Sequence, residues 1–223
     1  MFARVARRYD LVNRLMTLGW DRRWRKETVR LARPPADGLA LDVGAGTGDL
    51  SFLLAGRMPQ GTVVGVDLTP EMLAIARKRA QREDPLHRVL FVQGDALSLP
   101  FADATFDVIV TGFVMRNVTD MRSAFAEMHR VTKPGGRVAC LEVSRPDSRL
   151  IAGMHRFIFT HIVSTIGGLV AGDRSAYRYL PSSAAAFPSR EELAEIMHQA
   201  GWQVQEIRPL MLGAAAIHLG IKP

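Results

Sequence analysis

The chain contains 223 residues, of which 48% are hydrophobic and 23% are charged. This composition is typical of a globular protein, and the length suits a single domain, which we predict over residues 1–223. The one cysteine, Cys140, excludes a disulfide framework and a cysteine metal site within one chain, and we predict no metal centre. The charged N-terminus lacks the apolar core of a secretory signal, so we expect a cytoplasmic protein.

The formal net charge is +7, and much of the positive excess lies within residues 1–37. Such a charge attracts nucleic acid or an anionic membrane surface, or it belongs to an ordinary solvated surface. Nucleic-acid binding requires base-stacking aromatic residues, but aromatic residues make up only 7% of the chain and show no stacking cluster. We therefore predict no nucleic-acid partner and keep peripheral contact with an anionic membrane as an expectation.

The predicted elements alternate between strands and helices along the chain. Residues 1–37 have the pattern of one or two basic amphipathic helices, which we interpret as a lid. The predicted buried strands are 39–44, 62–67, 88–94, 106–112 and 137–143. Residues 202–208 and 213–221 predict a closing β-hairpin. This order predicts a doubly wound, Rossmann-like α/β fold whose sheet is mostly parallel, with an antiparallel C-terminal hairpin strand.

Local signals predict where the helices between these strands begin and end. Thr69 as N-cap and Pro70 at the first helical position open one helix. The Lys-Pro-Gly-Gly sequence at residues 133–136 stops the helix before it. Ser189 and Glu192 form a capping box that opens the last helix.

Residues 149–172 are strongly apolar. Their length suits a transmembrane helix, but the run is interrupted by Arg149, His155, Arg156 and His161. We therefore predict a helical insertion at 149–185 that covers the substrate pocket or touches the membrane surface. A plain core or interface helix is the alternative, and we favour an interface role for the two histidines.

The segment LDVGAGTGDL, residues 41–50, places three glycines directly after the first predicted strand. A dinucleotide-binding loop has the pattern G-x-G-x-x-G, but here the third glycine, Gly48, arrives one residue early. No Gly-Lys-Ser/Thr follows, so a nucleoside-triphosphate loop is also excluded. We interpret Gly44 and Gly46 as positions where a nucleotide-like cofactor approaches the backbone, with a tight structural turn as the alternative.

Two carboxylates at later strand ends narrow the choice of cofactor. Asp67 ends the second predicted strand, where a carboxylate can accept both hydroxyl groups of a ribose. Asp95 follows the third strand, where its carboxylate can accept the exocyclic amine of an adenine while Ala96 packs on the ring. Because no lysine or metal partner for a triphosphate is present, the pattern predicts an adenosine cofactor without a phosphate chain.

This combination resembles class I S-adenosylmethionine-dependent methyltransferases. The resemblance implies that Asp42 and the glycine loop face the positive sulfonium and the amino-acid moiety of the cofactor. Asp49, the third carboxylate of the loop, either faces the same group or caps the following helix.

A narrower resemblance covers almost the whole chain. YDLVNRLMTLGWDRRW (9–24) and RVTKPGGRVACLEVS (130–144) are similar to the two signatures of the UbiE/MenG family of quinone C-methyltransferases. LPFADATFDVIVTGFVMRNVTD (99–120) follows the core pattern of that family, and residues 175–183 and 213–223 also resemble it.

The resemblance implies transfer of a methyl group from S-adenosylmethionine to a ring carbon of a lipid-soluble polyprenyl quinol. Demethylmenaquinol is the favoured acceptor, and some relatives also use a benzoquinol precursor of ubiquinone. Beside the loop glycines, the residues that the resemblance assigns to the cofactor are Thr47, Asp67, Asp95 and Ala96, with Gly112 nearby and Leu68 on the adenine face.

Methylation of a ring carbon requires ionisation of a neighbouring hydroxyl group and removal of a proton. Arg116 is a candidate to lower the pKa of that hydroxyl or to orient a water. Asn117 is a candidate to form a hydrogen bond with the ring oxygen. A structural ion pair for Arg116 and a turn cap for Asn117 are equally good alternatives. Tyr9 lines the pocket from the lid or packs in the core, and Tyr177 and Tyr179 contact the quinol or only pack.

Three other functions compete with a quinol methyltransferase. They are methylation of another apolar small molecule, methylation of RNA, and a non-catalytic cofactor-binding subunit of a quinone-synthesis complex. Turnover with different acceptors would distinguish methylation of another apolar molecule. RNA methylation predicts salt-sensitive RNA binding, and a non-catalytic subunit would bind the cofactor without transferring its methyl group. A homodimer is our expectation for the assembly.

Overall fold

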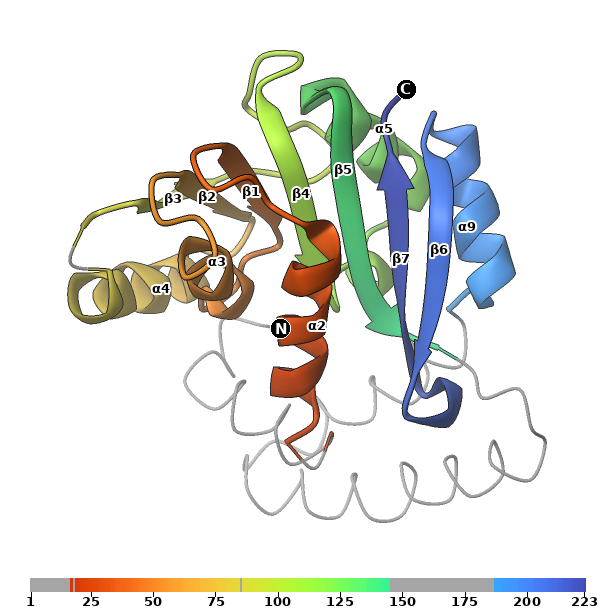
Figure 1. The fold of residues 1–223 in the computed structure, drawn as a ribbon, viewed down its shortest axis with the longest axis horizontal. Helices are drawn as coiled ribbons and strands as arrows, with labels where there is room; N and C mark the ends of the chain where they lie inside the picture. Colours follow the sequence, from red (N-terminus) through yellow and green to blue (C-terminus); the bar gives the residue numbers. More distant parts are fainter. Residues whose placement is uncertain (1–16, 18, 85, 145–186) are drawn as a thin grey trace.

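Figure 1 shows the fold in the computed structural model, which describes residues 17, 19–84, 86–144 and 187–223. One seven-stranded sheet has the order β3-β2-β1-β4-β5-β7-β6. Its strands are β1 (Leu39–Val43), β2 (Thr62–Asp67), β3 (Val89–Gln93), β4 (Phe106–Gly112), β5 (Thr132–Val143), β6 (Gln203–Leu210) and β7 (Ala215–Ile221). Strands β1 to β5 pair in parallel, whereas β7 is antiparallel to both β5 and β6. The predicted mostly parallel sheet and its closing hairpin are confirmed.

Helices pack on both faces of the sheet. The first face carries α2 (Asp21–Ala32), α3 (Asp49–Ala55) and α4 (Pro70–Glu83), and the opposite face carries α5 (Met121–Val131) and α9 (Arg190–Gln199). Two short 3₁₀ turns, η1 (Met115–Asn117) and η3 (Met211–Gly213), follow β4 and β6. Each face has its own apolar core, as a sheet covered on both sides requires.

Alternation along β1 decides which of its side chains enter each layer. Leu41 and Val43 belong to the core beneath α5 and α9, whereas Ala40 belongs to the core beneath α2, α3 and α4. Successive side chains of a strand point to opposite faces, so Asp42 shares the face of Ala40. There the Ser51 hydroxyl, on α3, donates to Asp42 Oδ2 at 2.6 Å. The strand therefore buries one carboxyl group inside an otherwise apolar layer.

Strand β5 begins earlier than the sequence predicts. We expected it over residues 137–143, but it starts at Thr132, directly after the last residue of α5. Thr132 pairs with Phe106 of β4 before an irregularity in the register. The Gly135 N–H donates to the Lys222 carbonyl, and the Lys222 N–H donates to the Gly136 carbonyl. Pairing with the end of the chain thus extends the strand through the Pro-Gly-Gly sequence, which by local propensity only ends the helix.

The predicted helix starts are confirmed, although one uses a different partner. At α9, Ser189 Oγ accepts the Glu192 N–H at 3.1 Å, and Glu192 Oε2 accepts the Ser189 N–H at 2.7 Å. At α4, Thr69 is the N-cap residue and Pro70 is the first helical residue, but the Thr69 side chain makes no capping bond. Asp67 Oδ1 instead accepts the Thr69 N–H at 2.8 Å.

Some predicted features lie outside the described residues. They are the insertion at 149–185 with His155, His161, Tyr177 and Tyr179, and residues 1–16 of the predicted lid with Tyr9. The later part of that segment forms α2, which packs against β4, β5 and α3. Within the described part of the chain, no helix combines the length and apolar character needed to cross a bilayer.

Candidate functional site

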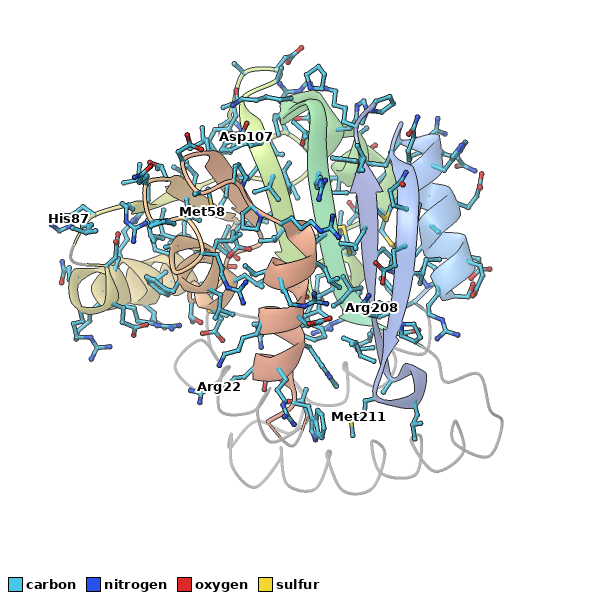
Figure 2. All side chains as sticks on the ribbon, in the orientation of Figure 1. Arg22, Met58, His87, Asp107, Arg208 and Met211 are labelled. Carbon is cyan, nitrogen blue, oxygen red and sulfur yellow. The ribbon has the colours of Figure 1, made fainter. Side chains whose placement is uncertain are left out.

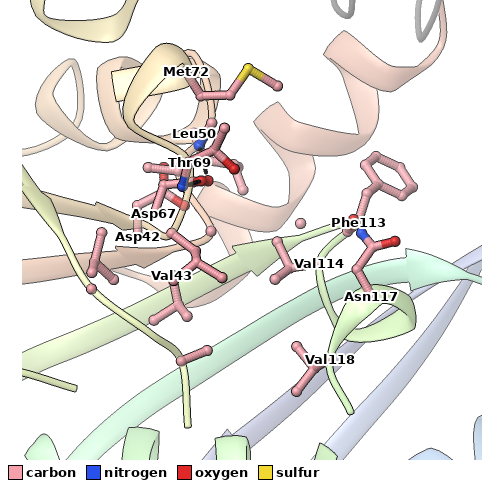
Figure 3. Close-up of a pocket in the computed structure, with 18 of the residues that line it drawn as sticks. Asp42, Val43, Leu50, Asp67, Thr69, Met72, Phe113, Val114, Asn117 and Val118 are labelled. Carbon is pink, nitrogen blue, oxygen red and sulfur yellow. Dashed lines mark hydrogen bonds between the residues drawn. The ribbon is translucent and has the colours of Figure 1, made fainter. Parts of the chain in front are cut away.

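A cavity of about 310 Å³ opens where the parallel strands end. Its walls come from the loop after β1 and from the residues that follow β2, β3 and β4. Strands β2 and β3 lie on one side of β1, and β4 lies on its other side. The cavity is therefore at the point where the strand order reverses. Figure 3 shows Asp42, Asp67 and Thr69 on one side of this cavity and Phe113, Asn117 and Val118 on the other.

The glycine loop shapes the floor of the cavity. Gly44 and Gly46 have φ values of +72° and +55°, which a residue with a side chain adopts only at a cost. A Cβ atom on Gly44 would come within 2.2 Å of the Val114 side chain, whereas one on Gly46 would meet nothing within 4 Å. Gly44 is therefore required for packing, and Gly46 leaves open space beside exposed backbone. This open backbone is the feature that lets a ligand approach closely.

Asp67 holds this loop as well as lining the cavity. Its Oδ2 atom accepts the Gly46 N–H, and its Oδ1 atom accepts the Thr69 N–H, each at 2.8 Å. A carboxylate oxygen has two lone pairs, so each oxygen retains capacity for a ligand hydroxyl group. The carboxylate predicted to bind ribose thus stands at the cavity, oriented by two backbone donors.

The residues predicted for the adenine lie together along the same wall. Leu68, Asp95 and Ala96 all line the cavity. Asp95 is exposed, and its Oδ1 atom accepts the Leu97 N–H at 2.9 Å. Leu68 is 64% exposed, which is unusual for a large apolar side chain and leaves its surface available to a flat ring. The structure therefore brings the three predicted residues to one place.

Asp42 is the most deeply buried carboxyl group of the cavity wall, at 1% exposure. Its pKa is raised to about 7, mainly by burial; the hydrogen bond from Ser51 lowers it, and the nearby Asp67 contributes to the rise. Its Oδ1 atom has no hydrogen-bond partner among the described residues. Because buried polar atoms are nearly always paired, this oxygen indicates a position for a polar or cationic ligand group.

Sequence reasoning missed two arginines that surround the loop. Arg25, on α2, lines the cavity and pairs with Asp21, and its Nε lies 3.9 Å from Asp49 Oδ2. Arg79, on α4, donates to the Thr47 carbonyl at 2.9 Å and pairs with Asp49 at 2.9 Å. The four-residue spacing of Asp21 and Arg25 was the available signal, but it does not show that the pair is buried.

These contacts settle one of the open alternatives for Asp49. Gly48 is the N-cap of α3, and Asp49 is its first residue. The Asp49 carboxylate lines the cavity and faces both guanidinium groups, so the capping role considered for it is wrong. Thr47 and Gly112, both assigned to the cofactor by resemblance, also line the cavity.

Comparison with known proteins decides between the remaining classes of enzyme. The model of the ubiE/COQ5 methyltransferase family matches residues 1–222. A demethylmenaquinone methyltransferase of Roseiflexus sp. is 51% identical over 222 residues, which cover 100% of this chain and 92% of that protein. The chain belongs to the ubiE/COQ5 methyltransferase family.

Other relatives agree with this assignment. A ubiquinone/menaquinone biosynthesis C-methyltransferase of Desulfotalea psychrophila is 40% identical, over 100% of this chain and 89% of that protein. A crystal structure of an S-adenosylmethionine-dependent methyltransferase from Aquifex aeolicus has a TM-score of 0.67 and 18% identity, with 89% of each chain covered. That likeness shows the fold alone. The prediction of a methyltransferase with S-adenosylmethionine as its cofactor is confirmed.

The cavity of this family member fits that cofactor. Gly46 offers open backbone, Asp67 and Asp95 stand at adjacent strand ends, and the unpartnered Asp42 oxygen suits a cationic group. Arg25 supplies a guanidinium group in the same wall, opposite in charge to a carboxylate of an amino-acid moiety.

Of the candidate catalytic residues that the structure describes, Asn117 faces the cavity of the methyltransferase and Arg116 does not. Asn117 lines the cavity, and its amide donates weakly to the Phe113 carbonyl at 3.4 Å. Arg116 is not among the lining residues; its Nη1 pairs with Glu142 Oε1 at 2.9 Å. Glu142 Oε1 also accepts the Val143 N–H at 2.9 Å, so the carboxylate is firmly held. The pair corresponds to the structural alternative for Arg116, and a catalytic role for it stays a prediction.

The buried ion pair predicts a specific loss of stability. The side chains of Arg116 and Glu142 are only 7% and 1% exposed, so Glu142→Gln leaves a guanidinium without its partner inside the protein. We expect the free energy of unfolding in urea to fall by about 3 kcal/mol or more.

Asp103→Asn is the control for that measurement. Asp103 pairs with Arg130 at 2.7 Å, but its side chain is 77% exposed. We expect this variant to lose less than about 1 kcal/mol. Equal losses in the two variants would show that burial does not govern the Arg116–Glu142 pair.

Proposed function

We propose that the protein transfers a methyl group from S-adenosylmethionine to a ring carbon of a polyprenyl quinol, with demethylmenaquinol as the main acceptor. The observation that carries the proposal is the full-length similarity to a relative named demethylmenaquinone methyltransferase, at 51% identity. The carboxylates and open glycine backbone of the cavity support the cofactor side of the reaction.

The cofactor residues follow from the walls of the cavity. Asp67 accepts the ribose hydroxyl groups, Asp95 accepts the adenine amine, and Leu68 and Ala96 pack on the ring. The remaining contacts come from Gly44, Gly46, Thr47 and Gly112, together with Arg25 at the carboxylate of the amino-acid moiety. When bound, S-adenosylmethionine supplies an electrophilic methyl group on a positively charged sulfur.

The opposite wall is suited to the acceptor. Phe113, Val114 and Val118 give it an apolar surface, and Asn117 is its polar group. Asn117 bonds the ring oxygen of the quinol and keeps the reactants in line. Arg116 is adjacent to Asn117 in the chain and is held by Glu142, so we propose it as a positioning residue for this wall. Tyr9 completes the catalytic set as a prediction from the family pattern.

A benzoquinol precursor of ubiquinone is the second candidate acceptor. The observation in its favour is the 40% identical relative whose name includes both ubiquinone and menaquinone biosynthesis. Methylation of other apolar molecules, and a non-catalytic role in a quinone-synthesis complex, have no such support. A homodimer remains our expectation for the assembly.

A transfer assay tests the proposed reaction. The full chain, labelled S-adenosylmethionine and short-chain demethylmenaquinol are combined in detergent, and label on the quinol ring is measured. We expect transfer to demethylmenaquinol, with the corresponding benzoquinol as the parallel acceptor. Cofactor binding without label on either quinol would overturn the proposed function.

The ribose carboxylate gives a second test. We expect Asp67→Asn to weaken binding of S-adenosylmethionine by at least about 1.5 kcal/mol, or roughly tenfold, because a hydrogen bond to a charged group is lost. Asp107→Asn is the matched control: its carboxylate accepts the N–H of Leu39, the first residue of β1, at the other edge of the sheet. Unchanged affinity in Asp67→Asn would show that the cofactor lies elsewhere.

A membrane surface is the proposed source of the lipid-soluble acceptor. Three large apolar side chains are exposed near the start of α2 and in η3: Trp20 at 42%, Met211 at 45% and Leu212 at 69%. Glu27 of α2 pairs with Arg208 of β6 at 2.7 Å, which joins the two elements. Arg22 and Met211 lie at the same end of the molecule in Figure 2.

The chemistry of this end suits an anionic bilayer. Met211 and Leu212 have φ values of +46° and +56°, which are unfavourable for residues with a side chain. These strained positions carry two exposed apolar side chains. Arg22 and Arg23 are exposed beside Trp20, and cations near an anionic membrane contribute about 1 kcal/mol each. We therefore assign the protein to the cytoplasmic face of the membrane as a peripheral enzyme.

Vesicle binding tests this surface. We expect the double variant Trp20→Ser, Leu212→Ser to bind phosphatidylserine-containing vesicles roughly tenfold or more weakly, because each large apolar side chain contributes about 1.5 kcal/mol or more. Leu86→Ser, at a 66% exposed leucine between α4 and β3, is the control. Binding that is equal in all three proteins, or insensitive to salt, would contradict the assignment.

A further inference from the structure

Among the described carboxyl groups of the cavity, Asp42 is the one with a buried oxygen that has no hydrogen-bond partner. Ser51 donates to Oδ2 at 2.6 Å, whereas Oδ1 has no partner among the described residues although the side chain lines the cavity. Asp67, by comparison, receives a backbone N–H on each oxygen. Asp42 is therefore the carboxyl group whose state depends most on what occupies the cavity.

The charges around Asp42 are few. Burial raises its pKa to about 7; Asp67, on β2, raises it, and Arg25, on α2, lowers it. Helix α3 contributes the Ser51 hydroxyl and brings Asp49 to the same cavity. On the neighbouring strands, Gly65 and Val110 stand in register with Asp42 and carry no charge. Within the described part of the chain, Asp42 forms no ion pair that would compete with a ligand cation for the carboxylate.

We propose that Asp42 determines the preference of the site for S-adenosylmethionine over S-adenosylhomocysteine by exchanging a proton with solvent. Near neutral pH the Asp42 carboxyl group is protonated in a large fraction of the ligand-free protein. It ionises when a cationic ligand binds. This inference rests on the proposed function, because it concerns the same cofactor site.

The charges of the two ligands give the direction of the effect. S-adenosylmethionine has a sulfonium, an ammonium and a carboxylate group, so its net charge is positive, whereas S-adenosylhomocysteine has no sulfonium and is neutral overall. A nearby positive charge favours the ionised carboxyl group and lowers its pKa. Binding of S-adenosylmethionine therefore releases a proton, and its affinity falls as the pH falls below the pKa of the free site. Binding of the neutral product is coupled to this proton much more weakly.

The coupling also favours turnover. In methyl transfer the bond between sulfur and the methyl carbon breaks and its electron pair stays on sulfur, while the ring carbon forms the new bond and releases its proton to solvent. The ligand thereby loses its sulfonium charge, so the ionised Asp42 carboxyl group faces a ligand that has no net positive charge. Either the carboxyl group then takes up a proton from solvent, or S-adenosylhomocysteine dissociates. In both cases the product is held less tightly than S-adenosylmethionine.

Titration calorimetry of the full chain tests the proposal. Dissociation constants are measured for both ligands between pH 5.5 and 7.5; the two ligands carry the same α-amino group, so its titration near the top of this range affects both alike. Two buffers with different ionisation enthalpies give the number of protons released. We expect the affinity for S-adenosylmethionine to fall about twentyfold across this range, because the ionised fraction of a group with a pKa of about 7 falls by that factor. The affinity for S-adenosylhomocysteine is expected to change less than about fivefold by the same linkage.

Two variants assign the effect to the residue. In Asp42→Asn, the pH dependence and the proton release are expected to disappear. In Ser51→Ala, the loss of the donor that favours the charged form is expected to move the midpoint to higher pH. Asp107→Asn, at the other edge of the sheet, is the matched control and should keep the dependence of the unmodified protein.

The outcomes separate this inference from the proposed function. Equal pH dependence for the two ligands, or a dependence that survives in Asp42→Asn, would overturn the role of Asp42. Because the comparison of ligands uses the unmodified protein, it does not depend on folding of a variant. Proton-coupled binding without transfer to a quinol would overturn the proposed reaction alone, and absence of cofactor binding would overturn both.

Discussion

The carboxylate of Asp67 is the contact on which the geometry of the cavity depends. One oxygen accepts the Gly46 N–H and the other the Thr69 N–H, each at 2.8 Å. Gly46 belongs to the loop after β1, and Thr69 is the N-cap of α4. A single side chain at the end of β2 therefore fixes the glycine loop, the start of a helix and its own orientation. Backbone donors hold the carboxylate in place before any ligand arrives, which reduces the reorganisation needed on binding.

Two arginines extend this support from outside the loop. Arg79 reaches from α4 to the Thr47 carbonyl and the Asp49 carboxylate, and Arg25 approaches Asp49 from α2. Asp49 thus stands between guanidinium groups from both neighbouring helices. Among the described residues, Asp42 is then the carboxyl group of this wall with a buried oxygen that has no partner. The distinction arises from packing, because all three carboxylates have the same chemistry.

The sequence was sufficient for the fold and for most of the residues that line this wall of the cavity. Strand ends in a parallel sheet share one edge, so Asp67 and Asp95 could be brought together from their positions alone. Arg25 could not, since burial of one arginine among many basic residues depends on how α2 packs. The early start of β5 depends on pairing with Lys222, a contact between distant parts of the chain that has no local signal. Arg116 illustrates the same limit, because its partner, Glu142, lies on another strand.

Phe113 lies between the two walls of the cavity that we propose for the cofactor and the acceptor. It follows β4 with a φ value of +62°, a conformation that costs a bulky residue on the order of 1–3 kcal/mol. Its N–H donates to the Leu141 carbonyl at 2.8 Å, and its ring is only 7% exposed, so pairing and burial offset that strain. The guanidinium carbons of Arg25 and Arg116 lie 5.5 and 5.4 Å from the ring centroid. One strained aromatic residue therefore packs between Arg25 of α2 and Arg116 of η1, the turn that carries Asn117. A catalyst that must hold two reactants in line needs such a fixed spacing, and here an apolar side chain supplies it.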